Sequence, residues 1–274
     1  SESDVFFLIG EGYESSSLIK FIDENNINHV ELLSSVNPMA FEEDHDDHEG
    51  HGHDDEKHSD GDHEGHGHDD EKHSDDDHEG HGHDDEKHSD GAHEGHGHGE
   101  FDPHFWFDID RVIMATEKIT QTMVAMDPDN EKSYVDNQAA YSKKLVDFAL
   151  QTKDKIDNSK ISSVPFITMH ESLGYLIEKY SLSYTGSVYA YNLEDLEITS
   201  NKYIEMLDII QSSNSKFLIL EDNVGKKMAD SIVEDTGINL IKGMTVENMK
   251  SANQSYIDWL DNNLSILIEG LSIK

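Results

Sequence analysis

Short apolar runs alternate with helical patterns on both sides of a long polar stretch, which predicts an α/β fold. Near the start, an apolar run at residues 4–9 leads into a glycine-containing turn, a helical pattern at 15–24 and a second run at 29–33. The later strands are predicted at 166–169, 184–189, 217–220 and 238–241, with helices at 172–180, 199–212, 224–236 and 253–271. Strands joined through helices favour mainly parallel sheets, whose ligands bind at the carboxyl ends of the strands.

Two helical patterns separate these α/β regions. The first follows a capping Asp108 or Asp110 and runs to about residue 126, where Asp127-Pro128 interrupts it. The second, from about 130 to 156, would be about 40 Å long, enough to cross a domain. We therefore expect two lobes joined by a long linker helix. The predicted N-terminal lobe is 1–128, the linker helix 129–157 and the C-terminal lobe 158–274.

Residues 42–100 have a different composition from the rest of the chain. They contain 25 acidic residues, 3 lysines and 16 of the 19 histidines, and Ala92 is their only hydrophobic residue. Such a segment cannot bury a core, so we interpret it as a disordered His/Asp/Glu-rich loop inserted in the N-terminal lobe. Its repeat, His-Glu-Gly-His-Gly-His, has a period of 15 residues but no apolar face, which argues against a stacked-repeat fold.

The histidines of the repeat are candidate secondary metal sites. In the pattern His-x-x-His-x-His the glycines permit tight turns, and the surrounding carboxylates concentrate divalent cations. A solvated acidic tether is the alternative, but it would not require so many histidines. Binding should be weaker than at a preorganised site, since ordering the loop costs conformational entropy. The candidates are His48, His51, His53, His63, His66, His68, His78, His81, His83, His93, His96 and His98.

Charge and motif content exclude several functions. The formal net charge of -39 disfavours binding to nucleic acids, and no apolar run approaches the roughly 20 residues that span a bilayer. Without cysteine, the chain has no disulfides, thiolate metal sites or cysteine nucleophiles. His48-Glu49-Gly50-His51 is one residue short of the zinc-peptidase pattern His-Glu-x-x-His. We expect a monomer that is not an enzyme.

Only three histidines lie outside the loop. His29 opens a strand beside polar residues, and a structural or solvent role is the simplest interpretation. His104 lies between a stiff Asp102-Pro103 turn and the aromatic run 105–107, whereas His170 ends an apolar strand. Two imidazoles on rigid supports suit zinc, which takes nitrogen ligands at about 2.0 to 2.1 Å.

These two histidine segments resemble a known family. Asp102-Pro103-His104-Phe105-Trp106 and the segment PFITMHESLGY at 165–175 are similar, in this order, to motifs of the metal-binding solute-binding proteins of ABC transporters, the cluster A-I family, and of its zinc-uptake branch in particular. The turn at 10–14, the break at Asp127-Pro128 and the acidic loop are also similar to features of that branch.

The resemblance implies an extracytoplasmic, periplasmic-type protein that captures Zn(II) between two lobes and delivers it to a membrane permease. His104 and His170 would be the second and third ligands. The family's first ligand, another histidine, lies upstream of the strand at 4–9, so we expect either that the N-terminal lobe lacks its first strands here or that a loop histidine substitutes. Fourth-ligand candidates are Glu247, Glu221 and Asp222, although a solvated acidic face is the favoured interpretation of each.

The resemblance also bears on the choice of metal. The manganese branch has Glu at the third position and an Asp shortly before the terminal helix, whereas this chain has His170 and no Asp between Lys242 and Gln254. Zinc is therefore favoured. The alternative function is a zinc buffer or metallochaperone that acts mainly through the histidine-rich loop.

Overall fold

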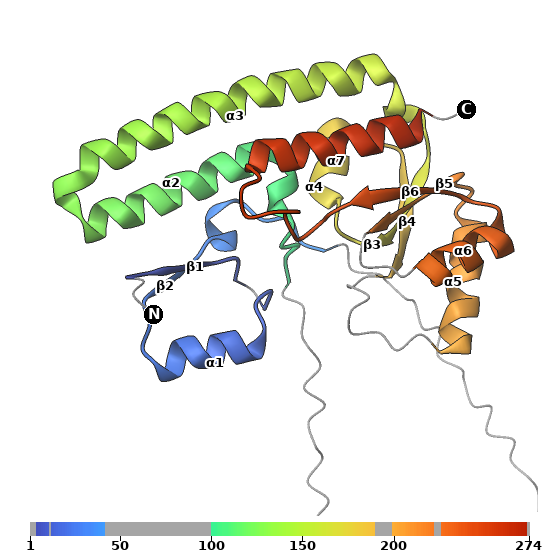
Figure 1. Ribbon diagram of the computed structural model, residues 1–274, viewed down its shortest axis with the longest axis horizontal. Helices are drawn as coiled ribbons and strands as arrows, with labels where there is room; N and C mark the ends of the chain where they lie inside the picture. Colours follow the sequence, from blue (N-terminus) through green and yellow to red (C-terminus); the bar gives the residue numbers. More distant parts are fainter. Residues whose placement is uncertain (1–3, 11, 42–99, 190–198, 222–225, 273–274) are drawn as a thin grey trace, which may run out of the picture. The chain divides into compact units, whose positions relative to one another are not determined.

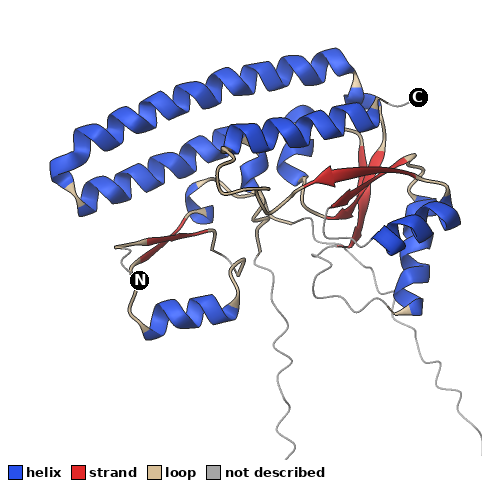
Figure 2. Cartoon of the chain, viewed as in Figure 1, coloured by secondary structure: helices blue, strands red, loops and turns tan. Residues whose placement is uncertain are grey.

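The computed structural model describes residues 4–10, 12–41, 100–189, 199–221 and 226–272 (Figure 1). Helices and strands alternate along the described chain, apart from two consecutive helices at Ile109–Met126 and Glu131–Ser159, as the sequence pattern predicts (Figure 2). The strands are β1 (Phe6–Leu8), β2 (His29–Glu31), β3 (Phe166–His170), β4 (Tyr184–Tyr189), β5 (Phe217–Glu221) and β6 (Asn239–Met244). The α-helices are α1 (Ser16–Glu24), α2 (Ile109–Met126), α3 (Glu131–Ser159), α4 (Gly174–Tyr180), α5 (Ser200–Ser212), α6 (Lys226–Thr236) and α7 (Tyr256–Leu271).

The larger sheet has four parallel strands in the order β4-β3-β5-β6. Successive side chains of a strand point to opposite faces, so each strand contributes to two cores. Phe166, Phe217 and Ile219 belong to one hydrophobic cluster, and Ile167 and Leu218 belong to the other. Every residue of β3 is buried, as expected for an inner strand of a parallel sheet covered on both faces.

Helices cover the two faces of this sheet. The first cluster also contains buried residues of α3, α4 and α7, among them Phe148, Leu176 and Leu264. The second contains Met206 of α5 and Ile232 of α6. Parallel strands need crossover connections, and α4, α5 and α6 supply them while helping to bury the apolar faces of the sheet.

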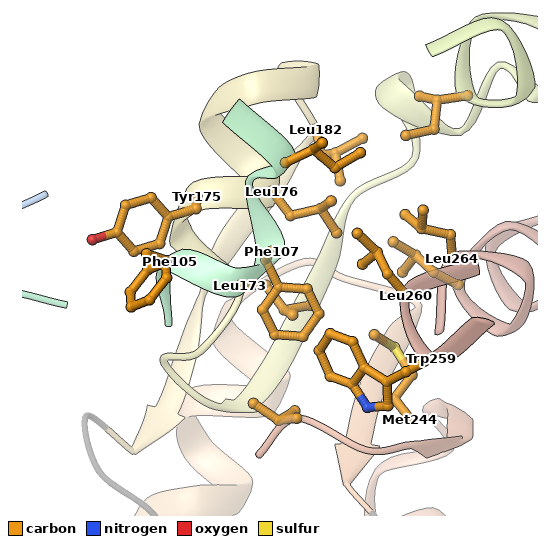
Figure 3. Packing of buried hydrophobic residues seen from close by; sticks show 14 of the residues in the cluster. Phe105, Phe107, Leu173, Tyr175, Leu176, Leu182, Met244, Trp259, Leu260 and Leu264 are labelled. Carbon is orange, nitrogen blue, oxygen red and sulfur yellow. The ribbon is translucent and has the colours of Figure 1, made fainter. Parts of the chain in front are cut away.

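The core beneath the histidine segments is rich in aromatic side chains (Figure 3). Phe105 and Phe107 belong to a single 3-10 turn, η2 (Phe105–Phe107), and are both buried. They pack with Leu173 near the start of α4 and with Trp259 of α7, where the ring centroids of Phe107 and Trp259 are 5.3 Å apart. The segment that carries His104 is therefore anchored in the same core as the sheet.

The smaller sheet pairs β1 with β2 in parallel, with Phe6 opposite His29. At the end of β1, Gly10 has a φ of +95°, which favours glycine, and a Cβ there would lie 2.9 Å from the Glu31 side chain. The Glu14 carboxylate accepts hydrogen bonds from the backbone N–H groups of Ile9, at 2.5 Å, and Gly10, at 3.0 Å. The predicted glycine turn is thus closed by a side chain that lies just before the N-cap of the next helix.

The two helices between the sheets follow the predicted course. Asp108 caps α2 by accepting a hydrogen bond from the backbone N–H of Asp110 at 3.0 Å, and the helix ends before Pro128. The following helix, α3, has 29 residues and packs along α2. A long helix is thus found where one is predicted, whereas its role as a linker and the lobe boundaries at 128 and 158 stay a prediction.

Differences between predicted and observed elements are confined to short pieces. The last strand extends to Met244, beyond the predicted residue 241, and four 3-10 turns of three residues each have no counterpart in the sequence analysis. Segments this short contain too few residues to show a period. The predicted loop lies outside the described residues except for Glu100. At its two ends, the Phe41 N–H donates to the Glu100 carbonyl at 3.2 Å.

Among the described helices, none is both long and apolar enough to cross a membrane.

Candidate metal centre

His104 is held by the residue two positions before it. One carboxylate oxygen of Asp102 accepts hydrogen bonds from the His104 backbone N–H, at 2.8 Å, and from its ring Nδ1, at 2.7 Å. A carboxylate oxygen can only accept, so the proton of the neutral ring resides on Nδ1. Both side chains are buried. The arrangement leaves Nε2 of His104 as the nitrogen able to bind a metal.

His170 is held by the backbone of the large sheet. It is the last residue of β3, with Tyr189 of β4 as its register partner, and it is only 2% exposed. Its position at the carboxyl end of an inner parallel strand is the usual place for a ligand-binding side chain in such sheets.

The structure brings the two predicted histidines together. Their ring centroids are 5.5 Å apart, although 65 positions separate them in the chain. Glu247 joins them, since one ligand atom from each of His104, His170 and Glu247 lies within 4.8 Å of the others. Tetrahedral zinc at about 2.0 Å from its ligands would separate these atoms by about 3.3 Å, so small side-chain shifts suffice.

Glu247 lies on the segment between β6 and α7, and its side chain is 25% exposed. The carboxylate is 4.0 Å from Nε2 of His104. From the sequence alone Glu247 is only a possible fourth ligand, because an acidic residue in a polar segment gives no signal of its spatial neighbours. The structure places it in the cluster.

Three side chains fix this segment. The Nε1–H of Trp106 donates to the Val246 carbonyl at 2.9 Å, and the Nε1–H of Trp259 donates to the Thr245 hydroxyl at 2.9 Å. Buried Asn263 of α7 accepts a hydrogen bond from the Thr245 N–H and donates to its carbonyl, both at 3.0 Å. Trp106 therefore connects the His104 turn directly to the residue before Glu247.

A pocket of about 280 Å³ adjoins the cluster, and its walls are mainly apolar. Glu247 belongs to both, and Trp106, which lines the pocket, has its ring 5.3 Å from the His104 ring. Tyr13, from the turn after β1, contacts Trp106 edge-on at 5.5 Å. Burial raises the pKa of Tyr13 well above its usual value, with a further contribution from the charge of Glu247. Tyr13 thus stays a neutral hydroxyl beside the cluster.

The other predicted residues lie away from the centre or outside the described part. His29 is exposed, with its Nδ1 3.3 Å from the Ile27 carbonyl, in agreement with the structural or solvent role inferred for it. The twelve candidate histidines of the loop, Asp222 and the side chain of Glu221 fall outside the described residues.

A family match over almost the whole chain establishes the class of the protein. The family model described as "Zinc-uptake complex component A periplasmic" matches residues 1–270, and the chain belongs to that family. Membership confirms the predicted class, the metal-binding solute-binding proteins, which are not enzymes, and a location outside the cytoplasm.

Particular relatives differ in the metal for which they are named. The chain is 28% identical over 174 residues to the zinc-binding lipoprotein AdcA of Streptococcus pneumoniae R6, covering 61% of this chain and 34% of AdcA. It is 29% identical over 178 residues to the high-affinity zinc uptake system protein ZnuA of Bacillus subtilis, covering 63% of this chain and 54% of ZnuA. The manganese-binding lipoprotein MntA of Halalkalibacterium halodurans is 24% identical, and the match covers 62% of this chain and 57% of MntA. The matches thus cover about a third to somewhat over half of each relative.

Solved structures confirm the fold. The periplasmic zinc-binding protein TroA of Treponema pallidum superimposes with a TM-score of 0.66 at 12% identity, covering 98% of this chain and 81% of TroA. The Mn-bound periplasmic metal-binding protein of Candidatus Liberibacter asiaticus superimposes with a TM-score of 0.64 at 17% identity, again covering 98% of this chain and 81% of that protein.

Proposed function

We propose that this protein captures Zn(II) at the centre formed by His104, His170 and Glu247 and delivers it to the membrane permease of an ABC transporter. The observation that carries the proposal is the convergence of two buried imidazoles and one carboxylate from three separate segments. Family membership supports the transport role.

The donor set favours zinc over manganese. Imidazole suits zinc, whereas carboxylate, carbonyl and water oxygens suit manganese, and two of the three donors here are imidazoles. The relatives named for zinc are also somewhat more similar to the chain than MntA is, at 28% and 29% against 24%.

Three protein ligands leave one tetrahedral position for another donor. A histidine upstream of Ser1 or a histidine of the loop 42–100 are the two candidates that follow from the family pattern. The proposed role of the loop is to scavenge zinc or to sense high zinc, through weaker sites that exchange metal quickly.

The competing function is a zinc buffer or metallochaperone in which the loop binds most of the metal. Deleting residues 42–99 separates the two functions. Phe41 and Glu100 are already joined by a hydrogen bond, so a short glycine linker can connect them. Because residues 1–41 and 97–274 form one compact unit, this deletion variant is expected to fold.

Isothermal titration calorimetry of the deletion variant should show one tight zinc site. Loss of an outer-shell partner of a metal ligand typically costs 10- to 100-fold in affinity, so His104→Ala or His170→Ala in this background should cost at least about 100-fold. His29→Ala is the matched control, since His29 is exposed and does not belong to the cluster, and the zinc affinity of this variant should be unchanged. A deletion variant without a tight site would favour the buffer, and unchanged affinity in the two centre variants would refute the ligand assignment.

A further inference from the structure

We infer that Asp102, held by Gly174 and Tyr175 at the start of α4, is a positioning residue that fixes the metal-binding nitrogen of His104. The inference rests on the proposed role of His104 as a zinc ligand. It adds a physical link between the two histidine supports, because α4 follows directly after the strand that ends in His170.

The first step is the hydrogen bond between Asp102 and His104. At 2.7 Å, the contact from Nδ1 to the carboxylate is short, and the same oxygen accepts the His104 backbone N–H. An imidazole that donates one N–H to a carboxylate has its tautomer and its ring orientation fixed, and the free nitrogen becomes a better metal donor. Asp102 therefore acts on the metal through His104 without belonging to the cluster of possible ligands.

The start of α4 lies close to the Asp102 carboxylate. A Cβ placed on Gly174 would lie 2.9 Å from the second carboxylate oxygen of Asp102, closer than real Cβ contacts allow. The end of the Asp102 side chain could move aside only by disturbing the oxygen bound to His104. Glycine at 174 therefore leaves the space that the Asp102 carboxylate occupies.

The third step is the adjacent Tyr175, which is fully buried. Its hydroxyl donates to the Asp102 carbonyl at 2.7 Å and accepts from the Met39 N–H at 3.0 Å. The Asp102 N–H in turn donates to the Met39 carbonyl at 2.8 Å. Backbone and side chain of Asp102 are thus held from different directions, which restricts the position of the carboxylate.

The test measures the His104 tautomer and the zinc affinity separately, in the variant lacking residues 42–99. In the zinc-free protein, ¹⁵N NMR of the His104 ring should show a protonated Nδ1 and a bare Nε2. Asp102→Ala should give a mixture of tautomers and weaken zinc binding by about 10- to 100-fold. Asp102→Asn keeps an acceptor at the same place but loses the carboxylate, so it should retain the tautomer and lose about 10-fold or less.

Gly174→Ala provides a second, independent variant. Alanine has the higher helix propensity, so this change should not weaken α4 itself. Zinc affinity should nevertheless decrease by several-fold, with a disturbed His104 ring signal, because the methyl group displaces the carboxylate.

Asp108→Asn is the matched control. Asp108 is another buried aspartate of the same segment, but it pairs with Arg111 and Lys179 rather than with His104. It should alter stability without changing the tautomer. An unchanged His104 tautomer and zinc affinity in folded Asp102→Ala would overturn the inference. Absence of zinc binding by the unsubstituted deletion variant would instead overturn the proposed function, while the NMR result would still decide the role of Asp102.

Discussion

The two histidines of the centre are supported in different ways. His170 ends an inner strand whose five residues are all buried, so the hydrogen bonds to the two neighbouring strands and the hydrophobic core hold it. His104 lies just before a single 3-10 turn and is positioned by side-chain hydrogen bonds through Asp102 and Trp106. The sheet support should be robust as long as the domain is folded, whereas the turn support should be sensitive to single polar groups.

The largest effect on stability is expected from Ile167→Ala in β3. Ile167 is fully buried in the second core, and truncating such a residue costs about 2 to 5 kcal/mol. Zinc affinity of the folded fraction should change less than about threefold, because the backbone of β3 still pairs with β4 and β5. Urea unfolding and calorimetry on the same samples measure both quantities. A loss of affinity without a loss of stability would contradict the distinction between the two supports.

Alkaline pH should lower the free energy of unfolding through Tyr175, whose hydroxyl holds the backbone of Asp102. Burial raises the pKa of Tyr175 to about 12, from the usual value of 10. Between these two values the unfolded state releases the proton while the folded state keeps it, so the free energy of unfolding decreases as pH rises. From pH 10 to 11.5 the contribution of Tyr175 should be roughly 1.5 kcal/mol.

Denaturant unfolding at several pH values checks this expectation, with Tyr175→Phe as the comparison. The variant should be less stable than the unsubstituted protein at pH 9 but should lose less stability above pH 10. Tyr180, whose pKa burial also raises to about 12, remains in both proteins and cancels in the difference. Parallel pH curves would contradict the assignment.

The smallest effect is expected from Trp106→Phe. Phenylalanine keeps an aromatic ring but removes the 2.9 Å hydrogen bond to the Val246 carbonyl, a loss worth about 1 kcal/mol. Zinc affinity should fall about three- to tenfold if that bond helps to position Glu247 beside the histidines. Calorimetry of this variant, alongside Trp259→Phe, tests whether the link from the His104 turn matters more than the one from α7. Equal zinc affinities for Trp106→Phe and the unsubstituted protein would show that the hydrogen bond from Trp106 to Val246 does not position Glu247.

Most of the fold could be predicted from the sequence because its signals are local. The apolar runs at 166–169 and 184–189, the Asp108 cap and the Asp127-Pro128 break each act over a few residues. The 3-10 turn after His104 was missed, since three residues show no period. Its conformation depends on Phe105 and Phe107 entering a core built by distant helices.

The histidine pair was predictable because each member lies in a recognisable local pattern. Glu247 was only one of three candidates for a fourth ligand, because its position depends on Trp106, Trp259 and Asn263, which hold the segment from outside. Gly174 was not predicted, since in the sequence it is an ordinary residue of a helix start.

By itself, the sequence determined the order of strands and helices, the acidic histidine-rich insertion and the two imidazole-bearing segments, since these follow from periodicity, composition and short spacing. Only the tertiary structure decided which nitrogen of His104 faces away from Asp102, that Glu247 lies beside the two histidines and that α4 presses against Asp102. Each of these depends on contacts within a few ångströms between residues distant in the chain, and such contacts leave no local trace in the sequence.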